Sequence, residues 1–124
     1  MGLKQRQKGV RGELLWRDEC HKHGFFGVRR QGQAMYQRGS EQADCAGLPH
    51  LHQEVKFVEH LNYRKAFAQA SRDCRAGEKP ILASKVSRGE WLVTIRSSDF
   101  FEFYLAWLLY GGRKDNPSPT GRKD

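Results

Sequence analysis

The chain of 124 residues is long enough for one domain with a modest hydrophobic core and too short for two. Its 22 Lys and Arg exceed its 14 Asp and Glu, and the resulting net charge of +8 favours a polyanionic partner, either nucleic acid or an anionic membrane. A membrane is disfavoured, because the sequence has no run near the ~20 apolar residues of a spanning helix and its basic N-terminus lacks the apolar core of a signal peptide.

The pattern of the first half predicts a helix followed by three strands. Residues 1–8 are polar and basic, and we expect a flexible arm there. The apolar stripe of Val10, Leu14 and Leu15 predicts a helix that Gly24 stops. From the N-terminus, the predicted elements are helix 9–23, strand 25–30, polar loop 31–41, short strand 42–46 and strand 49–57.

The second half predicts a helix, a strand hairpin and a final helix. Asn62 can cap a helix whose apolar residues recur at helical spacing, and Gly77 ends it. Residues 87–90 have the composition of a hairpin turn. The predicted elements are helix 62–76, strands 80–86 and 91–96, helix 100–110 and a flexible basic tail, 111–124. The order αβββαββα indicates an α/β fold with a mixed central β-sheet flanked by helices.

The last predicted helix is apolar around its whole circumference, and Glu102 is its single charged residue. Such a helix is buried on more than one side, and one face of a sheet cannot cover it. We therefore expect the stretch from Phe100 to Tyr110 to pack against a second subunit in a homodimer. Coverage by the tail or by another helix of the same chain is the alternative.

The three cysteines, Cys20, Cys45 and Cys74, form an odd set without CxxC spacing. A disulfide framework is not expected, and the default setting is a reducing cytoplasm. A zinc site would need two pairs of closely spaced ligands, which the cysteines and histidines do not provide. We interpret the cysteines as small buried residues.

The most informative polar residues lie on and before the strand 49–57. Successive side chains of a strand point to opposite faces, so His52, Glu54 and Lys56 share a face that core packing alone would not make polar. With Asp44 on the preceding strand or turn, they would form an oxygen-rich site suited to Mg²⁺ or Mn²⁺, with a lysine beside it. The structural alternative is an exposed strand pair, Glu54 and Lys56, with Asp44 in a turn.

The set Gly9…Glu13, Asp44 and Glu54-Val55-Lys56, on a helix, a strand and a second strand, resembles the PD-(D/E)XK nuclease superfamily. It is most similar to small single-domain members, the archaeal Holliday junction resolvases and related phage nucleases. The resemblance covers roughly residues 9–108, the expected nuclease domain being 9–110, and implies a restriction-endonuclease-like αβββαβ core. Ala43 stands where the family name has proline, at a position that varies freely. The similarity extends to Gly47-Leu48-Pro49, His52, Gln69-Ala70, Asp73 and Trp91-Leu92-Val93.

The resemblance implies a role for each site residue. Asp44 and Glu54 would bind the divalent metal, with the backbone carbonyl of Val55 as a further ligand. Glu13 would bind or orient a second metal or its water. Lys56 would position or deprotonate the attacking water, or stabilise charge on the phosphate; the sequence leaves both possibilities open.

Basic and polar residues around this set are expected to contact DNA. The resemblance places the end of the first strand and the following loop beside the active site, and N-terminal cations could extend a phosphate track. A solvated basic surface is the alternative for each cation, and an ordinary exposed glutamine for Gln69. The expected DNA-binding residues are Lys8, Arg11, Arg29, Arg30, Gln33, Arg38, Ser40 and Gln69.

The sequence thus favours a Mg²⁺- or Mn²⁺-dependent DNA endonuclease that nicks branched DNA such as four-way junctions, as a homodimer in the cytoplasm. A phage source is suggested by the resemblance alone. A restriction-like, flap or nonspecific nuclease acting on linear DNA is the first alternative. The second is a noncatalytic DNA-binding protein that keeps the fold.

Overall fold

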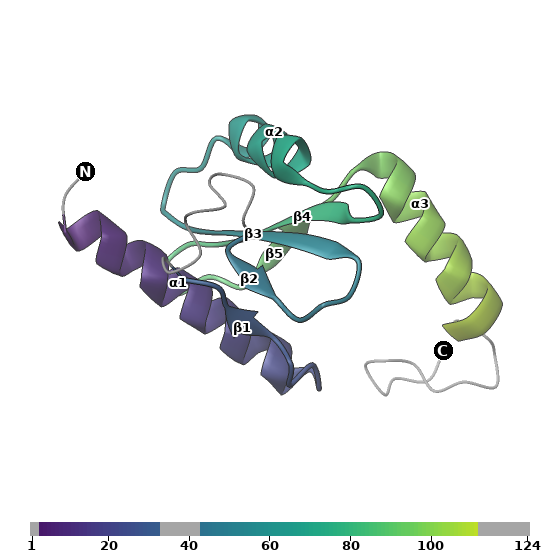
Figure 1. The fold of residues 1–124 in the computed structure, drawn as a ribbon, viewed down its shortest axis with the longest axis horizontal. Helices are drawn as coiled ribbons and strands as arrows, with labels where there is room; N and C mark the ends of the chain where they lie inside the picture. Colours follow the sequence, from purple (N-terminus) through teal and green to yellow (C-terminus); the bar gives the residue numbers. More distant parts are fainter. Residues whose placement is uncertain (1–2, 33–42, 112–124) are drawn as a thin grey trace.

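The computed structural model describes residues 3–32 and 43–111, except for the side chains of Lys4 and Gln5. It confirms the α/β class: a five-stranded mixed sheet lies between α1 (Leu3–Lys22) on one face and α2 (Tyr63–Asp73) on the other, and a further helix, α3 (Ser97–Ala106), extends from one side (Figure 1). The element order along the chain is αβββαββα, as the sequence predicts, and a π-helical turn, η2 (Trp107–Gly111), continues α3.

The strands lie in the sheet in their chain order. They are β1 (Arg29–Arg30), β2 (Cys45–Ala46), β3 (Leu51–Phe57), β4 (Lys79–Lys85) and β5 (Leu92–Thr94). Helix α2 connects β3 to β4, the one parallel pair, and the other neighbours are antiparallel. A crossover helix of this kind covers one face of a parallel pair, which explains why the central strands β3 and β4 are the most buried.

The main core lies between α1 and the sheet. Trp16 on α1 packs beside Trp91, with ring centroids 5.1 Å apart, and its Nε1–H donates to Gln53 Oε1 at 2.9 Å. Val55 lies in the same buried cluster as Trp16. Gln53 and Val55 therefore face α1, and the alternation of the strand directs His52, Glu54 and Lys56 to the α2 face, as predicted.

Helix α1 begins six residues earlier than predicted, so residues 3–8 are helical and the expected arm 1–8 is wrong over that range. Lys, Arg, Gln and Leu are good helix formers, and a single Gly9 costs only ~1 kcal/mol inside a helix. Gly12 has a packing reason, because a Cβ there would lie 2.6 Å from Phe57 Cβ at the end of β3. At the other end, Gly24 adopts φ +95°, as a C-terminal stop requires.

The predicted strand 25–30 is wrong except for its last two residues. The Val28 N–H donates to the Phe25 carbonyl in a turn, and Phe25 and Phe26 are exposed, so only Arg29 and Arg30 join the sheet. The close approach of the backbone at Gly47 to the backbone at Gly27 explains this geometry. Gly47 has φ +111°, and a Cβ there would lie 2.3 Å from the Gly27 carbonyl oxygen. The short strand predicted at 42–46 is observed at Cys45–Ala46, and residue 42 lies outside the described residues.

Helix α2 begins as predicted, with the Lys65 N–H donating to the Asn62 side chain at 3.0 Å. It ends at Asp73 instead of near residue 76, because Glu78 closes a turn by accepting from the Arg75 N–H at 3.2 Å. The two later strands are β4, shifted by one residue from 80–86, and β5, which is shorter than 91–96.

Helix α3 corrects two expectations. It begins at Ser97 instead of residue 100, and its N-cap residue, Arg96, makes no side-chain capping bond. The expected burial of the helix is also not observed within the described chain, since every residue from 100 to 111 is exposed and Asp99 alone is buried. Lys79 anchors the first turn by bonding Asp99 and Glu102, at 3.2 and 3.0 Å. Among the described residues, no helix combines the length and apolar character needed to cross a membrane.

Candidate active site

Asp44 is fixed against β3 by two hydrogen bonds. Its backbone N–H donates to the Gln53 carbonyl at 3.0 Å, and its Oδ2 accepts from the Val55 N–H at 2.9 Å. Glu54 is the residue between Gln53 and Val55, the two residues of β3 that make these bonds. The carboxyl groups of Asp44 and Glu54 consequently lie within hydrogen-bonding reach of each other.

This carboxyl pair has a large electrostatic consequence. Burial and the neighbouring charge of Glu54 raise the pKa of Asp44 to about 8, with a smaller contribution from Glu13, although the Val55 N–H opposes the shift. Two ionised carboxylates in contact at low dielectric repel each other unless a proton or a cation lies with them. The pair therefore favours the binding of positive charge.

His52 holds Glu54 in place. Its Nε2 lies 3.0 Å from Glu54 Oε2, so an Nε2–H donates to that carboxylate, and both side chains are buried, with 2% and 7% of their surface exposed. The other ring nitrogen lies 3.8 Å from Glu78 Oε1. The sequence predicted a shared face for His52 and Glu54 but not this bond. The i, i+2 spacing of His52 and Glu54 on one strand was the sequence feature that could have indicated this bond.

Glu13 reaches the site from α1 and is paired with Arg30. The Arg30 Nε–H donates to Glu13 Oε1 at 2.7 Å, with both side chains largely buried. Burial raises the pKa of Glu13, and the Arg30 guanidinium opposes this, while Glu54 and Lys56 also act on it at longer range. Arg30 was predicted to contact DNA, and in the structure it neutralises the third carboxylate of the site.

Lys56 lies at the α2 side of the site. It lines a pocket of about 300 Å³ together with Gln69 and Lys65 of α2; the full lining is Lys56, Val58, His60, Leu61, Asn62, Lys65, Ala66 and Gln69. Gln69 and Lys56 thus line the same pocket, and so does Lys65, which the sequence did not indicate.

The carboxylate oxygens of the site suit a hard divalent cation that takes only some of its ligands from the protein and the rest from water. Among the described residues, no group of three or more His, Cys, Asp or Glu is arranged to hold a metal ion. Mg²⁺, however, commonly binds through one or two carboxylates and keeps several waters. Asp44 and Glu54 supply two such carboxylates, and Glu13, bonded to Arg30, would act on their waters at most. The Val55 carbonyl stays a prediction as a further ligand.

The other expected DNA-binding residues fall into three groups. Lys8 and Arg11 lie on α1 over the Phe57 ring, their charged groups 5.3 and 6.0 Å from its centroid. Arg29 is exposed at the sheet edge. Gln33, Arg38 and Ser40 lie outside the described residues.

The cysteines do not belong to the site. All three are free thiols; Cys20 and Cys45 are buried, as interpreted from the sequence, but Cys74 is only partly buried. Burial raises the pKa of Cys20 to about 11 and that of Cys45 to about 12, so both are protonated at neutral pH.

Comparison with protein-family models, curated proteins and solved structures found no match. The candidate site combines two neighbouring carboxyls, a third carboxylate neutralised by arginine, and a lysine that follows Glu54 on β3 and lines a pocket.

Proposed function

We propose that this protein is a divalent-metal-dependent DNA endonuclease of the PD-(D/E)XK type that hydrolyses phosphodiester bonds. The observation that carries the proposal is that the Asp44 carboxyl, directly before β2, accepts from the Val55 N–H of β3 and lies beside the Glu54 carboxyl, with Lys56 on the same strand as Glu54. Structural packing gains nothing from a half-buried carboxyl beside a buried one, whereas a cation-binding site requires such a pair.

Each residue has a chemical task in this proposal. Asp44 and Glu54 hold Mg²⁺ or Mn²⁺, which when bound would polarise a phosphoryl oxygen and lower the pKa of water. His52 fixes the orientation of Glu54 through its 3.0 Å bond, as outer residues commonly do for metal-binding groups. Lys56 supplies positive charge where a phosphate gains negative charge, or positions the attacking water. Glu13 orients water from the α1 side.

The positive charge of the chain supports DNA as the substrate. The net charge of +8 favours a polyanion, and the pocket beside Lys56 carries a second cation, Lys65, and the amide of Gln69. We propose branched DNA, such as a four-way junction, as the preferred form, and this preference rests on the resemblance to resolvases.

The test compares a four-way junction, labelled on each strand, with linear duplexes of the same arm sequences, in Mg²⁺ and in EDTA. The proposal predicts Mg²⁺-dependent, symmetric nicks in the junction and little cutting of the duplexes. Equal cutting of the junction and the duplexes would exclude the resolvase assignment and indicate a nuclease that acts on linear DNA. Binding without cutting, in Mg²⁺ and in Mn²⁺, would leave a noncatalytic DNA-binding protein.

We further propose that α3 and η2 form a homodimer interface. Phe100, Tyr104 and Trp107 stack along the helix with centroids 5.9 and 6.1 Å apart, and each is about 45% exposed. Exposed apolar surface of this extent marks an interaction site in a soluble protein. Two sites related by a twofold axis would also suit paired cuts in a symmetric junction.

Light scattering tests the dimer. The wild-type protein should have twice the chain mass of 14.3 kDa at micromolar concentration, and Trp107→Glu should lower this to one chain. Phe26→Glu is a matched control, because Phe26 is 76% exposed on another part of the fold. A monomeric wild-type protein would end the dimer proposal without touching the proposed chemistry.

A further inference from the structure

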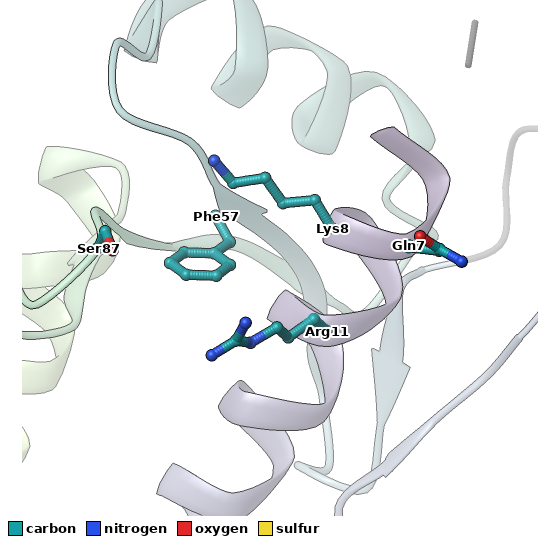
Figure 2. A pocket seen from close by; sticks show the side chains of 5 residues that line it. All are labelled: Gln7, Lys8, Arg11, Phe57 and Ser87. Atoms are coloured by element: carbon teal, nitrogen blue, oxygen red, sulfur yellow. The ribbon is translucent and has the colours of Figure 1, made fainter. Parts of the chain in front are cut away.

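A second cationic pocket lies on the α1 side of β3. It measures about 360 Å³ and is lined by Gln7, Lys8, Arg11, Phe57 and Ser87. Figure 2 shows Lys8 and Arg11 extending from α1 on either side of the Phe57 ring, with Ser87 of the β4–β5 turn opposite the helix. The pocket thus joins three separate segments of the chain.

The two cations of this pocket have no acidic partner within the described part of the chain. Neither Lys8 nor Arg11 forms an ion pair there, whereas Arg30 and His52 at the candidate active site pair with Glu13 and Glu54. Their charged groups lie 5.3 and 6.0 Å from the Phe57 centroid, within the range of cation–π attraction. The Phe57 ring therefore lies between these two cations (Figure 2), and an anion bound beside the ring would be stabilised by both.

The charged groups of the pocket are hydrogen-bond donors. Lys8 and Arg11 carry donors alone, and the Ser87 hydroxyl can donate as well, whereas the Gln7 amide points away from Phe57 (Figure 2). The Ser87 N–H is bonded to Glu59 Oε2 at 2.8 Å, which fixes the turn. Such a donor set suits the oxygens of a phosphate, and the aromatic ring offers apolar surface to a sugar.

Residues of the pocket and of the candidate active site are neighbours in sequence on two elements. Phe57 directly follows Lys56 on β3 and points to the opposite face, and Arg11 precedes Glu13 by two residues on α1. We propose that the pocket of Lys8, Arg11, Phe57 and Ser87 is a phosphate subsite for the DNA strand that is cut, binding a backbone phosphate next to the one at Asp44 and Glu54. The assignment of the ligand to DNA rests on the proposed function.

The first experiment measures DNA binding without cleavage. The affinity of fluorescein-labelled junction DNA is determined by anisotropy in EDTA between ~50 and ~200 mM KCl. The double variant Lys8→Gln/Arg11→Gln should show a log–log salt slope smaller by about 1, since the subsite holds one phosphate and each phosphate contact contributes ~0.9. The control, Lys22→Gln/Arg72→Gln, removes the same charge from exposed positions outside both pockets and should keep the wild-type slope.

The second experiment locates the phosphate. Neutral methylphosphonates are placed singly on each side of the mapped cut, or along the strand if none is found. At one position the methylphosphonate should weaken DNA binding by the wild-type protein but not by the double variant, because the neutral phosphate and the two substitutions remove the same contact. If the double variant fails to fold by circular dichroism, the single variants Lys8→Gln and Arg11→Gln replace it, and each should lower the slope by no more than about 1 because both cations contact the same phosphate.

The outcomes separate this proposal from the nuclease proposal. Equal slopes for the double variant and the control, or methylphosphonate effects that persist in the variant, overturn the subsite even if the wild-type protein cuts DNA. A smaller slope in a protein that never cuts DNA supports a phosphate subsite and overturns the nuclease instead.

Discussion

Neutralising Asp44 should make the metal-free protein more stable at alkaline pH. The folded-state pKa of Asp44 is about 8 and its ordinary value is 3.8, so between about pH 4 and pH 8 the folded chain holds a proton that the unfolded chain releases. Stability therefore falls as pH rises through this window, and the loss is complete above the folded-state pKa. Asp44→Asn keeps an oxygen for the Val55 N–H but has nothing to titrate.

The size of the effect follows from the shift. One pKa unit corresponds to ~1.4 kcal/mol, so a rise from about pH 6 to about pH 8 should cost the wild-type protein on the order of 2 kcal/mol. For a domain of this size, that is a fall of ~8 °C in Tm. The raised pKa of Glu13 acts in the same direction.

Thermal melts in EDTA at several pH values test this reasoning. Wild type and Glu90→Gln, a control at an exposed acid, should lose stability together as pH rises, and Asp44→Asn should lose much less. Adding Mg²⁺ at about pH 8 should restore the wild-type Tm, because the cation replaces the proton, and should leave Asp44→Asn unchanged. Parallel pH curves for wild type and Asp44→Asn would refute the electrostatic account of the pair.

Two further predictions concern groups that support the site. His52→Gln should weaken Mg²⁺ binding about tenfold by releasing Glu54, which Mg²⁺ titration of the melting temperature would detect, and an unchanged affinity would show that His52 does not orient the carboxylate. Gly12→Ala should destabilise the protein by about 1–3 kcal/mol in urea unfolding, because its Cβ would meet Phe57 Cβ at 2.6 Å. Gly9→Ala should instead stabilise it by ~0.5–1 kcal/mol, since the described residues leave at least 4 Å clear around that position, and equal effects of both substitutions would contradict the packing of α1 on β3.

The sequence predicted the helices and strands that a local, repeated pattern of residues indicates. The alternation in β3 assigned Glu54 and Lys56 to one face, and the spacing and Asn62 cap of α2 located that helix's start. It failed where contacts distant in sequence decide. The backbone contact of Gly47 with Gly27 and a turn at Phe25 shorten the first strand, and periodicity cannot reveal either.

The candidate site shows the same division. The residue types at Asp44, Glu54 and Glu13 were sufficient to propose a metal site. Spacing along the chain could not show that Arg30 pairs with Glu13, because the two residues meet only when β1 packs beside α1. Sequence reasoning therefore treated Arg30 as a free cation for DNA.

The measurement that tests the central claim most directly is Mg²⁺-dependent cutting of labelled junction DNA by wild type, Asp44→Asn and Glu90→Gln. The account predicts nicks with wild type and Glu90→Gln and none with Asp44→Asn, which should still bind the junction in EDTA. Cutting by Asp44→Asn at the wild-type rate would contradict the proposed site, and absence of cutting by the wild-type protein in Mg²⁺ and in Mn²⁺ would contradict the nuclease itself.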